Sequence, residues 1–345
     1  MALNFLENNN NPFRLTSFAQ GERWRAVVAV LVLVLVGAGG LLRQLGVGNQ
    51  MVLEKIESLT PNKVMQKFKI GGDIEVPPPI VKPQLPELIG EILPPESFTA
   101  HSVMVKDRET GALLYRKNEY DKWPLASITK LMSALVILEN NPDWATSTIV
   151  IGEDALDAHM YAGDVYTLDE LWQAGLIGSS NKAIISLVSA LGWTETAFVE
   201  RMNQKARELG MADSVFVDPT GLDAGDMASA SDTAILLNEV MKKEKITKAL
   251  LTTEYNLYSK EREKNHHMWN TDWLLLGWIP HQFKEFYGGK TGYIAASGYN
   301  FTMRVGDGVG HVVDVVILGA ESHEARFNEA KKISEWAFNN YKWLE

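Results

Sequence analysis

Residues 124–130 read Pro-Leu-Ala-Ser-Ile-Thr-Lys and lead directly into the apolar run Leu-Met-Ser-Ala-Leu-Val-Ile-Leu at 131–138. Apolar residues in this run recur three and four positions apart, which predicts a helix with one face in a hydrophobic core. Ser127 and Lys130 are predicted to share the first turn of that helix, because side chains three positions apart have Cβ atoms about 5–6 Å apart. At that distance a lysine amine can take the proton of a serine hydroxyl, so the pair is a candidate nucleophile beside a candidate base.

The Ser-x-x-Lys spacing alone does not establish catalysis. The same spacing occurs again at Ser179 and Lys182. A helix-capping serine followed by a solvated lysine is the ordinary explanation of such a pattern. Other parts of the chain must therefore decide between the two explanations.

The composition is that of a globular protein with a net negative charge. The chain has 345 residues, of which 46% are hydrophobic and 22% charged, and its formal net charge is −10, so it can form one large domain or two ordinary ones. This charge and the lack of a basic run argue against nucleic acid as a partner. The chain has no cysteine, which excludes disulfides, thiol catalysis and cysteine-based zinc sites. Because the histidines never form His-Glu-x-x-His, we expect neither a metal site nor a cofactor.

Residues 26–42 form an uncharged apolar segment. Arginines at 14, 23 and 25 precede it and Arg43 follows it, a bias that favours a cytoplasmic segment at 1–25 and an exported remainder. We favour a transmembrane signal anchor that holds the protein to the membrane. The segment is at the short end of the roughly 17–25 residues needed to span a bilayer, and the small residues at 37–39 could be a cleavage site, so a cleaved signal peptide is the alternative.

Residues 43–96 are predicted to be an extracytoplasmic spacer. Eight of the thirteen prolines lie between Pro61 and Pro95. Proline fixes φ and removes a hydrogen-bond donor, so such a segment is extended and semi-rigid. An irregular wrap on the surface of the domain is the alternative. The folded catalytic domain is predicted to span 97–345.

The predicted domain begins and ends with strands and is helical in its middle third. Strands are predicted at 101–107, 112–116, 148–151, 285–293, 299–305 and 312–318, and helices at 131–138, 167–176, 181–191, 194–209, 231–242 and 324–341. This order predicts an α/β fold of the α+β type, with a mostly antiparallel sheet flanked by helices and an inserted helical subdomain.

Two further motifs follow the Ser-x-x-Lys along the chain. Ser179-Ser180-Asn181 stands at the junction of two predicted helices, and Lys290-Thr291-Gly292-Tyr293 lies in the strand predicted at 285–293. Alone, the first motif would be an ordinary helix cap. The second contains Gly-Lys-Thr, but a P-loop would need glycine at 284, where Lys284 stands.

The ordered set Ser-x-x-Lys, Ser-x-Asn and Lys-Thr-Gly resembles that of the penicillin-binding proteins and serine β-lactamases. Asp218-Pro-Thr-Gly-Leu-Asp223 and Tyr287-Gly-Gly289 make it similar to the D-alanyl-D-alanine carboxypeptidase family, peptidase family S11. The resemblance covers roughly 97–341 and implies a β-lactamase/transpeptidase-like fold. It also implies a serine carboxypeptidase that acts on peptidoglycan stem peptides ending in D-Ala-D-Ala, outside a bacterial cell membrane. β-Lactam antibiotics would be its covalent inhibitors.

The resemblance gives the catalytic candidates their roles. Ser127 would attack the carbonyl of the terminal bond and form an acyl-enzyme, with Lys130 as its base. The backbone N–H groups of Ser127 and Tyr293 would hold the oxyanion, and Ser179 would relay a proton between Lys130 and the leaving amine. A lysine base must be neutral, so its pKa would have to fall from about 10.4 toward 7; burial, the helix N-terminus and a second ammonium at Lys290 all favour this.

The same resemblance gives the substrate-binding candidates. Asn181 would hydrogen-bond the peptide, and Gly292 would leave room for it. Lys290 and Thr291 would receive the terminal carboxylate, which needs a cation and a hydroxyl at the end of a groove. The extended stem peptide could pair with the strand of Lys290 as an added strand.

The sequence leaves the specific activity open. Lys182 follows Asn181, where family members often carry an acidic residue. A DD-endopeptidase of the same family differs from a carboxypeptidase in what flanks the groove, which sequence does not show. A non-catalytic peptidoglycan-binding relative is a further alternative, although the joint presence of the serines and lysines favours an enzyme. A β-lactamase is a weaker alternative. Class A β-lactamases resemble Ser-Asp-Asn, whereas Ser180 stands in the middle here, and no glutamate-bearing loop for rapid deacylation is evident.

Overall fold

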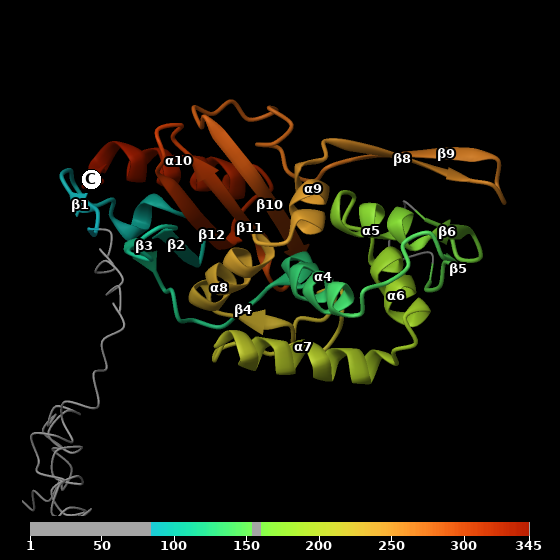
Figure 1. Cartoon of the computed structure of the whole chain (residues 1–345). Coiled ribbons are helices and arrows are strands. Elements are labelled where there is room, and N and C mark those ends of the chain that lie inside the picture. Colours follow the sequence, from blue (N-terminus) through green and yellow to red (C-terminus); the bar gives the residue numbers. More distant parts are fainter. Residues whose placement is uncertain (1–83, 154–159, 345) are drawn as a thin grey trace, which may run out of the picture. The chain divides into compact units, whose positions relative to one another are not determined.

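The computed structural model describes residues 84–153 and 160–344, so the apolar segment predicted at 26–42 lies outside the described residues. In the described part the chain forms a five-stranded antiparallel sheet with strand order β10-β11-β12-β2-β3 (Figure 1). The strands are β2 (Ser102–Asp107), β3 (Leu113–Lys117), β10 (Glu285–Ile294), β11 (Gly298–Gly306) and β12 (Val312–Ala320). Because β12 pairs with β2, the two ends of the domain meet in one sheet. The predicted α+β fold is confirmed.

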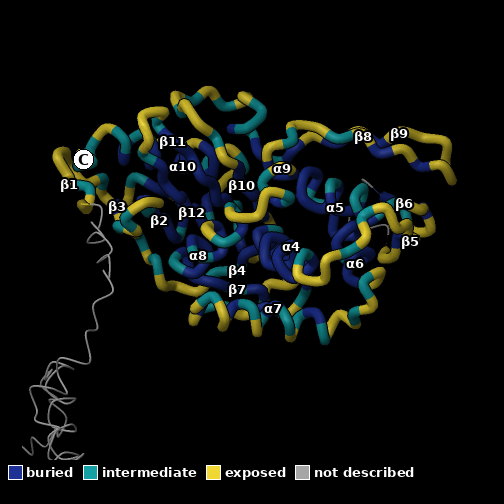
Figure 2. Tube along the Cα trace, in the orientation of Figure 1, coloured by how far each residue is buried: buried dark blue, intermediate teal, exposed yellow. Residues whose placement is uncertain are grey.

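The central strands β2, β11 and β12 are buried on both faces (Figure 2). Val105 belongs to a core that includes residues of helix α10 (Ala325–Asn340). Its neighbour Met104 belongs to a second core, shared with helices α4 (Thr129–Glu139) and α8 (Ala230–Val240). Successive residues of a strand point to opposite faces, so neighbouring residues serve different cores. A strand covered on both faces has no solvent side, which explains the apolar run at 315–318 in β12.

The middle of the chain forms the predicted helical subdomain. It contains α5 (Leu168–Leu176), α6 (Asn181–Ala190) and α7 (Glu195–Leu209). Helix α5 begins with a capping box, because the backbone N–H of Glu170 donates to Thr167 Oγ1 over 3.2 Å and the N–H of Thr167 donates to Glu170 Oε2 over 2.8 Å. These helices pack around α4, which is buried along most of its length. The subdomain therefore fixes the position of the helix that follows Ser127.

Four short strands form two pairs outside the main sheet, the second of them beside α5 and α6 (Figure 1). They are β4 (Trp123–Pro124) with β7 (Met227–Ala228), and β5 (Ser147–Ile149) with β6 (Val165–Thr167). The first pair holds the approach to Ser127. One further backbone hydrogen bond continues this pairing toward Ser127: the N–H of Leu125 donates to the carbonyl oxygen of Asp226 over 2.8 Å.

Sequence reasoning did not find helix α9 (Glu244–Leu251) or the hairpin of β8 (Glu254–Ser259) and β9 (Lys264–Trp269). Figure 1 shows this hairpin extending past α5. Only one side of each strand is buried, and the buried positions include Ser259 and His266. Polar residues at buried positions obscure the apolar alternation that predicts a strand.

The predicted domain boundary at residue 97 is too late. Strand β1 (Glu87–Leu88) pairs with β13 (Tyr341–Lys342), and Trp336 Nε1 donates to the carbonyl oxygen of Glu91 over 2.9 Å. Part of the predicted spacer thus packs on the domain, as in the alternative of a surface wrap. The prolines do not prevent this, because carbonyl oxygens and neighbouring N–H groups still make the bonds.

Within residues 84–153 and 160–344, no single helix is long and apolar enough to cross a membrane. Helices α6 and α7 satisfy that test only when taken together, and they are bent by 98° relative to each other.

Candidate active site

Ser127 lies in a single 3₁₀ turn, Ala126–Ile128, directly before α4. We predicted it inside the first turn of the α-helix, so the placement is one turn earlier than expected. The residue before it, Ala126, has φ of +49°, a left-handed conformation that costs an alanine about 1–2 kcal/mol. Such a conformation persists only where its surroundings hold it, and it is often found at active sites.

Lys130 lies on the first turn of α4 and is fully buried. Its Nζ is 2.7 Å from Ser127 Oγ, 2.7 Å from Asn181 Oδ1 and 2.9 Å from the carbonyl oxygen of Thr220. The predicted contact between the candidate nucleophile and the candidate base is therefore present. Asn181, expected to bind the peptide, also holds the amine through its side-chain oxygen.

Ser179 stands at the sharp turn between α5 and α6 and has φ of +60°. The next residue, Ser180, caps α6 by accepting the N–H of Ala183 over 3.1 Å. Ser179 is therefore not needed as the cap, and its hydroxyl accepts a hydrogen bond from Lys290 Nζ over 2.9 Å. The turn brings the second motif, at 179–181, against the third, at 290–293.

Burial and the charges around Lys290 lower its pKa. Lys290 is almost fully buried. Burial, followed by the positive charges of Lys130 and Arg326, lowers the pKa of Lys290 well below its usual range, and only the carboxyl of Asp272 opposes this. The repulsion between the two lysines therefore adds to burial in disfavouring the charged form of Lys290.

Arg326 and Asp272 complete this buried group of charges. Burial lowers the pKa of Arg326 to about 10, while Asp272 and Tyr299 oppose the change. Burial raises the pKa of Asp272 to about 7, although the N–H groups of Leu275 and Leu274 hydrogen-bond its carboxylate. The guanidinium of Arg326 donates to the carbonyl oxygen of Gly292 over 3.2 Å. It thereby supports the strand that carries the third motif.

Two glycines allow the backbone to approach Ser127. A Cβ on Gly292 would lie 2.5 Å from the carbonyl oxygen of Leu125. Gly221 has φ of +84°, and a Cβ there would overlap the carbonyl group of Ala126. We expected Gly292 to leave room for substrate; the structure shows that it leaves room for the turn before Ser127. Both glycines therefore determine where the candidate nucleophile stands.

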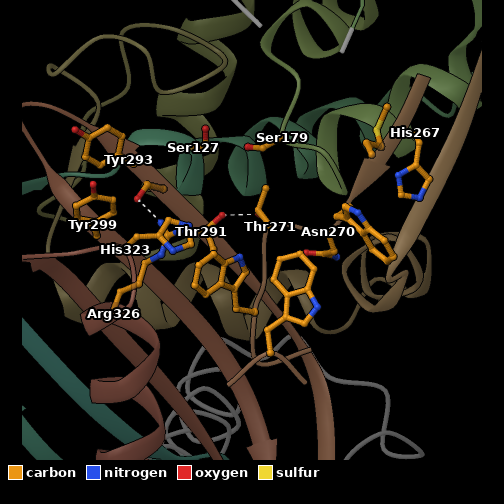
Figure 3. Close-up of a pocket in the computed structure, with 15 residues that line it drawn as sticks. Ser127, Ser179, His267, Asn270, Thr271, Thr291, Tyr293, Tyr299, His323 and Arg326 are labelled. Carbon is orange, nitrogen blue, oxygen red and sulfur yellow. Dashed lines mark hydrogen bonds between the residues drawn. The ribbon is translucent and has the colours of Figure 1, made fainter. Parts of the chain in front are cut away.

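A pocket of about 660 Å³ is lined by members of all three elements of the site, among them Ser127, Ser179 and Thr291. In Figure 3 its labelled lining runs from Tyr293 and Tyr299, past Ser127 and Ser179, to Asn270 and His267. The pocket is large enough for a small-molecule or peptide ligand, since such sites measure about 300–1,000 Å³. The Oγ1 atoms of Thr271 and Thr291 are 2.6 Å apart on its floor.

The comparisons with known proteins agree with this geometry. Residues 91–322 match the sequence model of the peptidase S11 family, described as D-alanyl-D-alanine carboxypeptidase. The chain belongs to this family. Its relatives include the D-alanyl-D-alanine carboxypeptidase DacF of Bacillus subtilis, 31% identical over 70% of this chain and 63% of DacF. A D-alanyl-D-alanine endopeptidase of Pseudomonas aeruginosa is 28% identical over 70% of this chain and 78% of that protein.

Solved structures have the same fold. Penicillin-binding protein D2 of Listeria monocytogenes in an ampicillin-bound form is 25% identical, with a TM-score of 0.62 over 72% of this chain and 100% of that one. A mutant of the Streptomyces K15 DD-transpeptidase is 22% identical, with a TM-score of 0.63 over 70% of this chain and 98% of that one; this likeness concerns the fold alone. The chain spans less than two thirds of DacF, so its activity remains a proposal.

Sequence reasoning missed several residues of this site. Thr271 and Asp272 lie in an irregular segment where no pattern marks them. Thr220 lies within the motif at 218–223, but sequence reasoning assigned it no role of its own. Arg326 does have a signal: it lies on the buried side of α10 with Ala330 and Ile333. A cation on an apolar helix stripe is rarely buried without a partner or a function.

Proposed function

We propose that this chain is a serine-type D-Ala-D-Ala carboxypeptidase that hydrolyses peptidoglycan stem peptides through an acyl-enzyme on Ser127. One observation carries the proposal: a buried lysine amine lies 2.7 Å from Ser127 Oγ, and Ser127 lines a pocket together with Ser179 and Thr291. An ordinary helix-capping serine followed by a solvated lysine would have neither a buried amine nor a pocket. Membership of the D-alanyl-D-alanine carboxypeptidase family supports the same assignment.

In the first half-reaction, Ser127 Oγ attacks the carbonyl carbon of the terminal D-Ala-D-Ala bond while the neutral amine of Lys130 takes the hydroxyl proton. The N–H groups of Ser127 and Tyr293 would hold the oxyanion. The carbon–nitrogen bond then breaks, and the proton passes from Lys130 to the departing amine with Ser179 as the relay. Free D-Ala leaves, and Ser127 carries the rest of the peptide as an ester.

In the second half-reaction, a water molecule attacks the ester carbonyl and gives one proton to the base. The ester bond breaks, Ser127 regains its proton, and the shortened peptide leaves as a carboxylate. Asn181 would position the peptide during both steps. Because Lys130 donates a hydrogen bond to the side-chain oxygen of Asn181, the side-chain nitrogen of Asn181 would donate to the peptide.

The substrate's terminal carboxylate would bind Lys290 and Thr291, with Arg326 as a further cation lining the pocket. A bound carboxylate favours the charged form of a nearby lysine. Since burial and neighbouring cations lower the pKa of Lys290, carboxylate binding should be coupled to the uptake of a proton there. Charge-assisted bonds of this kind are about twice as strong as neutral ones.

We also propose that the protein acts outside the cell membrane, held by a single transmembrane segment at 26–42, with β-lactam antibiotics as covalent inhibitors. The arginine bias around that segment and the penicillin-binding relatives support these proposals. Mass spectrometry of the mature protein tests the anchor: the sequence before residue 26 should be retained. A new N-terminus near residue 39 would mean a cleaved signal peptide.

Labelling with a fluorescent penicillin tests the proposed chemistry, because a β-lactam opened by the nucleophile stays attached as an ester. The full chain should be labelled, and Ser127→Ala should not. Ser189→Ala, which changes an exposed serine of α6, is the matched control and should be labelled like the parent. Undiminished labelling of Ser127→Ala would refute Ser127 as the nucleophile and make Ser179 the first replacement. Complete absence of labelling and of D-Ala release would favour a non-catalytic binding protein.

A further inference from the structure

The pocket continues past the point where a terminal carboxylate would bind. Tyr293 and Ser127 mark the position of the reacting carbonyl, and Thr291 lies two residues back along β10, about 6.6–6.8 Å away. Thr271 is hydrogen-bonded to Thr291, and Figure 3 shows the lining continuing beyond it to Asn270 and His267. A substrate that ends at the terminal D-Ala would therefore leave this far end of the pocket empty.

Three tryptophans line the far end. Trp269 and Trp278 are 48% and 52% exposed, and their ring centres are 5.9 Å apart. The ring centre of Trp273 is 5.6 Å from that of Trp278. We call Trp269 and Trp278 the indole wall. Tryptophan is usually well buried, so two half-exposed indoles on the wall of a catalytic pocket offer a large apolar contact surface to a ligand.

The indole wall is held in place by the backbone around it. Trp269 is the last residue of β9 and is paired with Glu254 of β8. The following residue, Asn270, is buried, and its side-chain nitrogen donates to the carbonyl oxygens of Leu250 and Thr252 over 3.1 and 2.9 Å. The surface is therefore formed before a ligand arrives, which reduces the entropy lost on binding.

We propose that the indole wall binds the leaving group of a cross-linked substrate, in which the amine released from D-Ala belongs to a second stem peptide. This inference rests on the proposed function. The leaving residue would be a diamino diacid such as diaminopimelate, because its reacting amine carries an α-carboxylate for Lys290 and Thr291. Its methylene chain would then lead past Thr271 onto the indoles. A terminal D-Ala has only a methyl group in place of this chain, and the side-chain amine of lysine has no carboxylate beside it.

The chemistry is that of the proposed carboxypeptidase with a larger leaving group. Ser127 forms an ester with the D-Ala of one stem, and the bond from that D-Ala to the second stem's amine breaks. The proton taken from Ser127 passes to that amine, and the second stem leaves. Water then hydrolyses the ester. The chain would thus act as a DD-endopeptidase as well as a carboxypeptidase.

The test compares two substrates: a monomeric muropeptide ending in D-Ala-D-Ala, and a dimer whose stems are joined through diaminopimelate. The full chain should cleave both. In Trp269→Ala and in Trp278→Ala, the ratio of dimer to monomer kcat/KM should fall ten- to hundredfold, mainly through KM. Tyr258→Ala, which changes a 48% exposed aromatic of the same hairpin outside the pocket, is the matched control and should leave the ratio unchanged.

Two results would overturn the inference while leaving the proposed function intact: cleavage of the monomer without cleavage of the dimer, or an unchanged ratio in both tryptophan variants. Failure of the proposed function would look different, because neither substrate would be cleaved and penicillin would not label Ser127. Penicillin labelling also reports whether each variant is folded. If Trp269→Ala fails to fold, the more exposed Trp278 supplies the test through Trp278→Ala.

Discussion

Replacing Gly221 by alanine tests how closely the 218–223 loop fits against the turn of Ser127. Gly221 has φ of +84°, and the carbonyl oxygen and carbon of Ala126 occupy the space that a Cβ would take. The preceding residue, Thr220, accepts a hydrogen bond from Lys130 through its carbonyl oxygen. A methyl group at 221 would therefore push the loop and the Ser127 turn apart and disturb both ends of the nucleophile–base pair.

Gly210 supplies the matched control, because it has φ of +80° at the end of α7 and nothing within 4 Å of a Cβ position. Its replacement by alanine should cost only the left-handed backbone conformation, about 1–2 kcal/mol of unfolding free energy. Gly221→Ala adds an overlap in a packed region, which typically costs about 1–3 kcal/mol more. The two variants should therefore differ by about 1–3 kcal/mol.

Urea denaturation of both variants measures this difference, and the rate of labelling by fluorescent penicillin measures the effect on the site. A displacement of about 1 Å in a catalytic group can cost about 100-fold in rate. We expect that loss in Gly221→Ala and near-normal labelling in Gly210→Ala. Equal destabilisation of the two variants, with normal labelling of both, would refute the close fit as the reason for glycine at 221.

Two further predictions concern charge. Lysine is charged below its pKa, and that of Lys290 is lowered, so kcat/KM for a D-Ala-D-Ala peptide should fall at a lower pH than ordinary lysine titration would give. In Lys290→Arg the wider guanidinium should reduce turnover about 10- to 150-fold. Because arginine stays charged, the same variant should move the alkaline fall of kcat/KM to higher pH. An alkaline fall at the parent's pH would contradict the assignment. Burial raises the pKa of Asp272 to about 7, so protonation of this carboxyl contributes to the free energy of unfolding. The contribution is complete below the unfolded pKa of about 3.9 and is lost as the pH rises through 7. Asp272→Asn should therefore gain in stability relative to the parent between pH 4 and pH 8, by at most about 4 kcal/mol at about 1.4 kcal/mol per pH unit; a difference that stays constant across urea melts in that range would exclude this titration.

Much of the fold could be predicted from the sequence because its signals are local. The capping box at 167–170, the glycine at the end of α7 and the apolar run of β12 each depend on neighbouring residues, and the structure has all three. The hairpin of β8 and β9 was missed because its buried side includes polar residues. The domain boundary was misplaced because the pairing of β1 with β13 joins segments about 250 residues apart, a distance over which sequence patterns carry no signal.

The sequence by itself determined the spacing of Ser127 and Lys130 and the order of the three motifs, because residues three apart on a helical turn must be neighbours. Only the tertiary structure decided which charges surround them. Asp272 comes from the segment before β10 and Arg326 from α10, and it is their burial beside Lys290 that changes the pKa values of all three. The indole wall likewise lines the pocket only because the segment after β9 lies against β10, where Thr271 is hydrogen-bonded to Thr291. Burial and long-range charge depend on the whole fold, and no local pattern of residues encodes them.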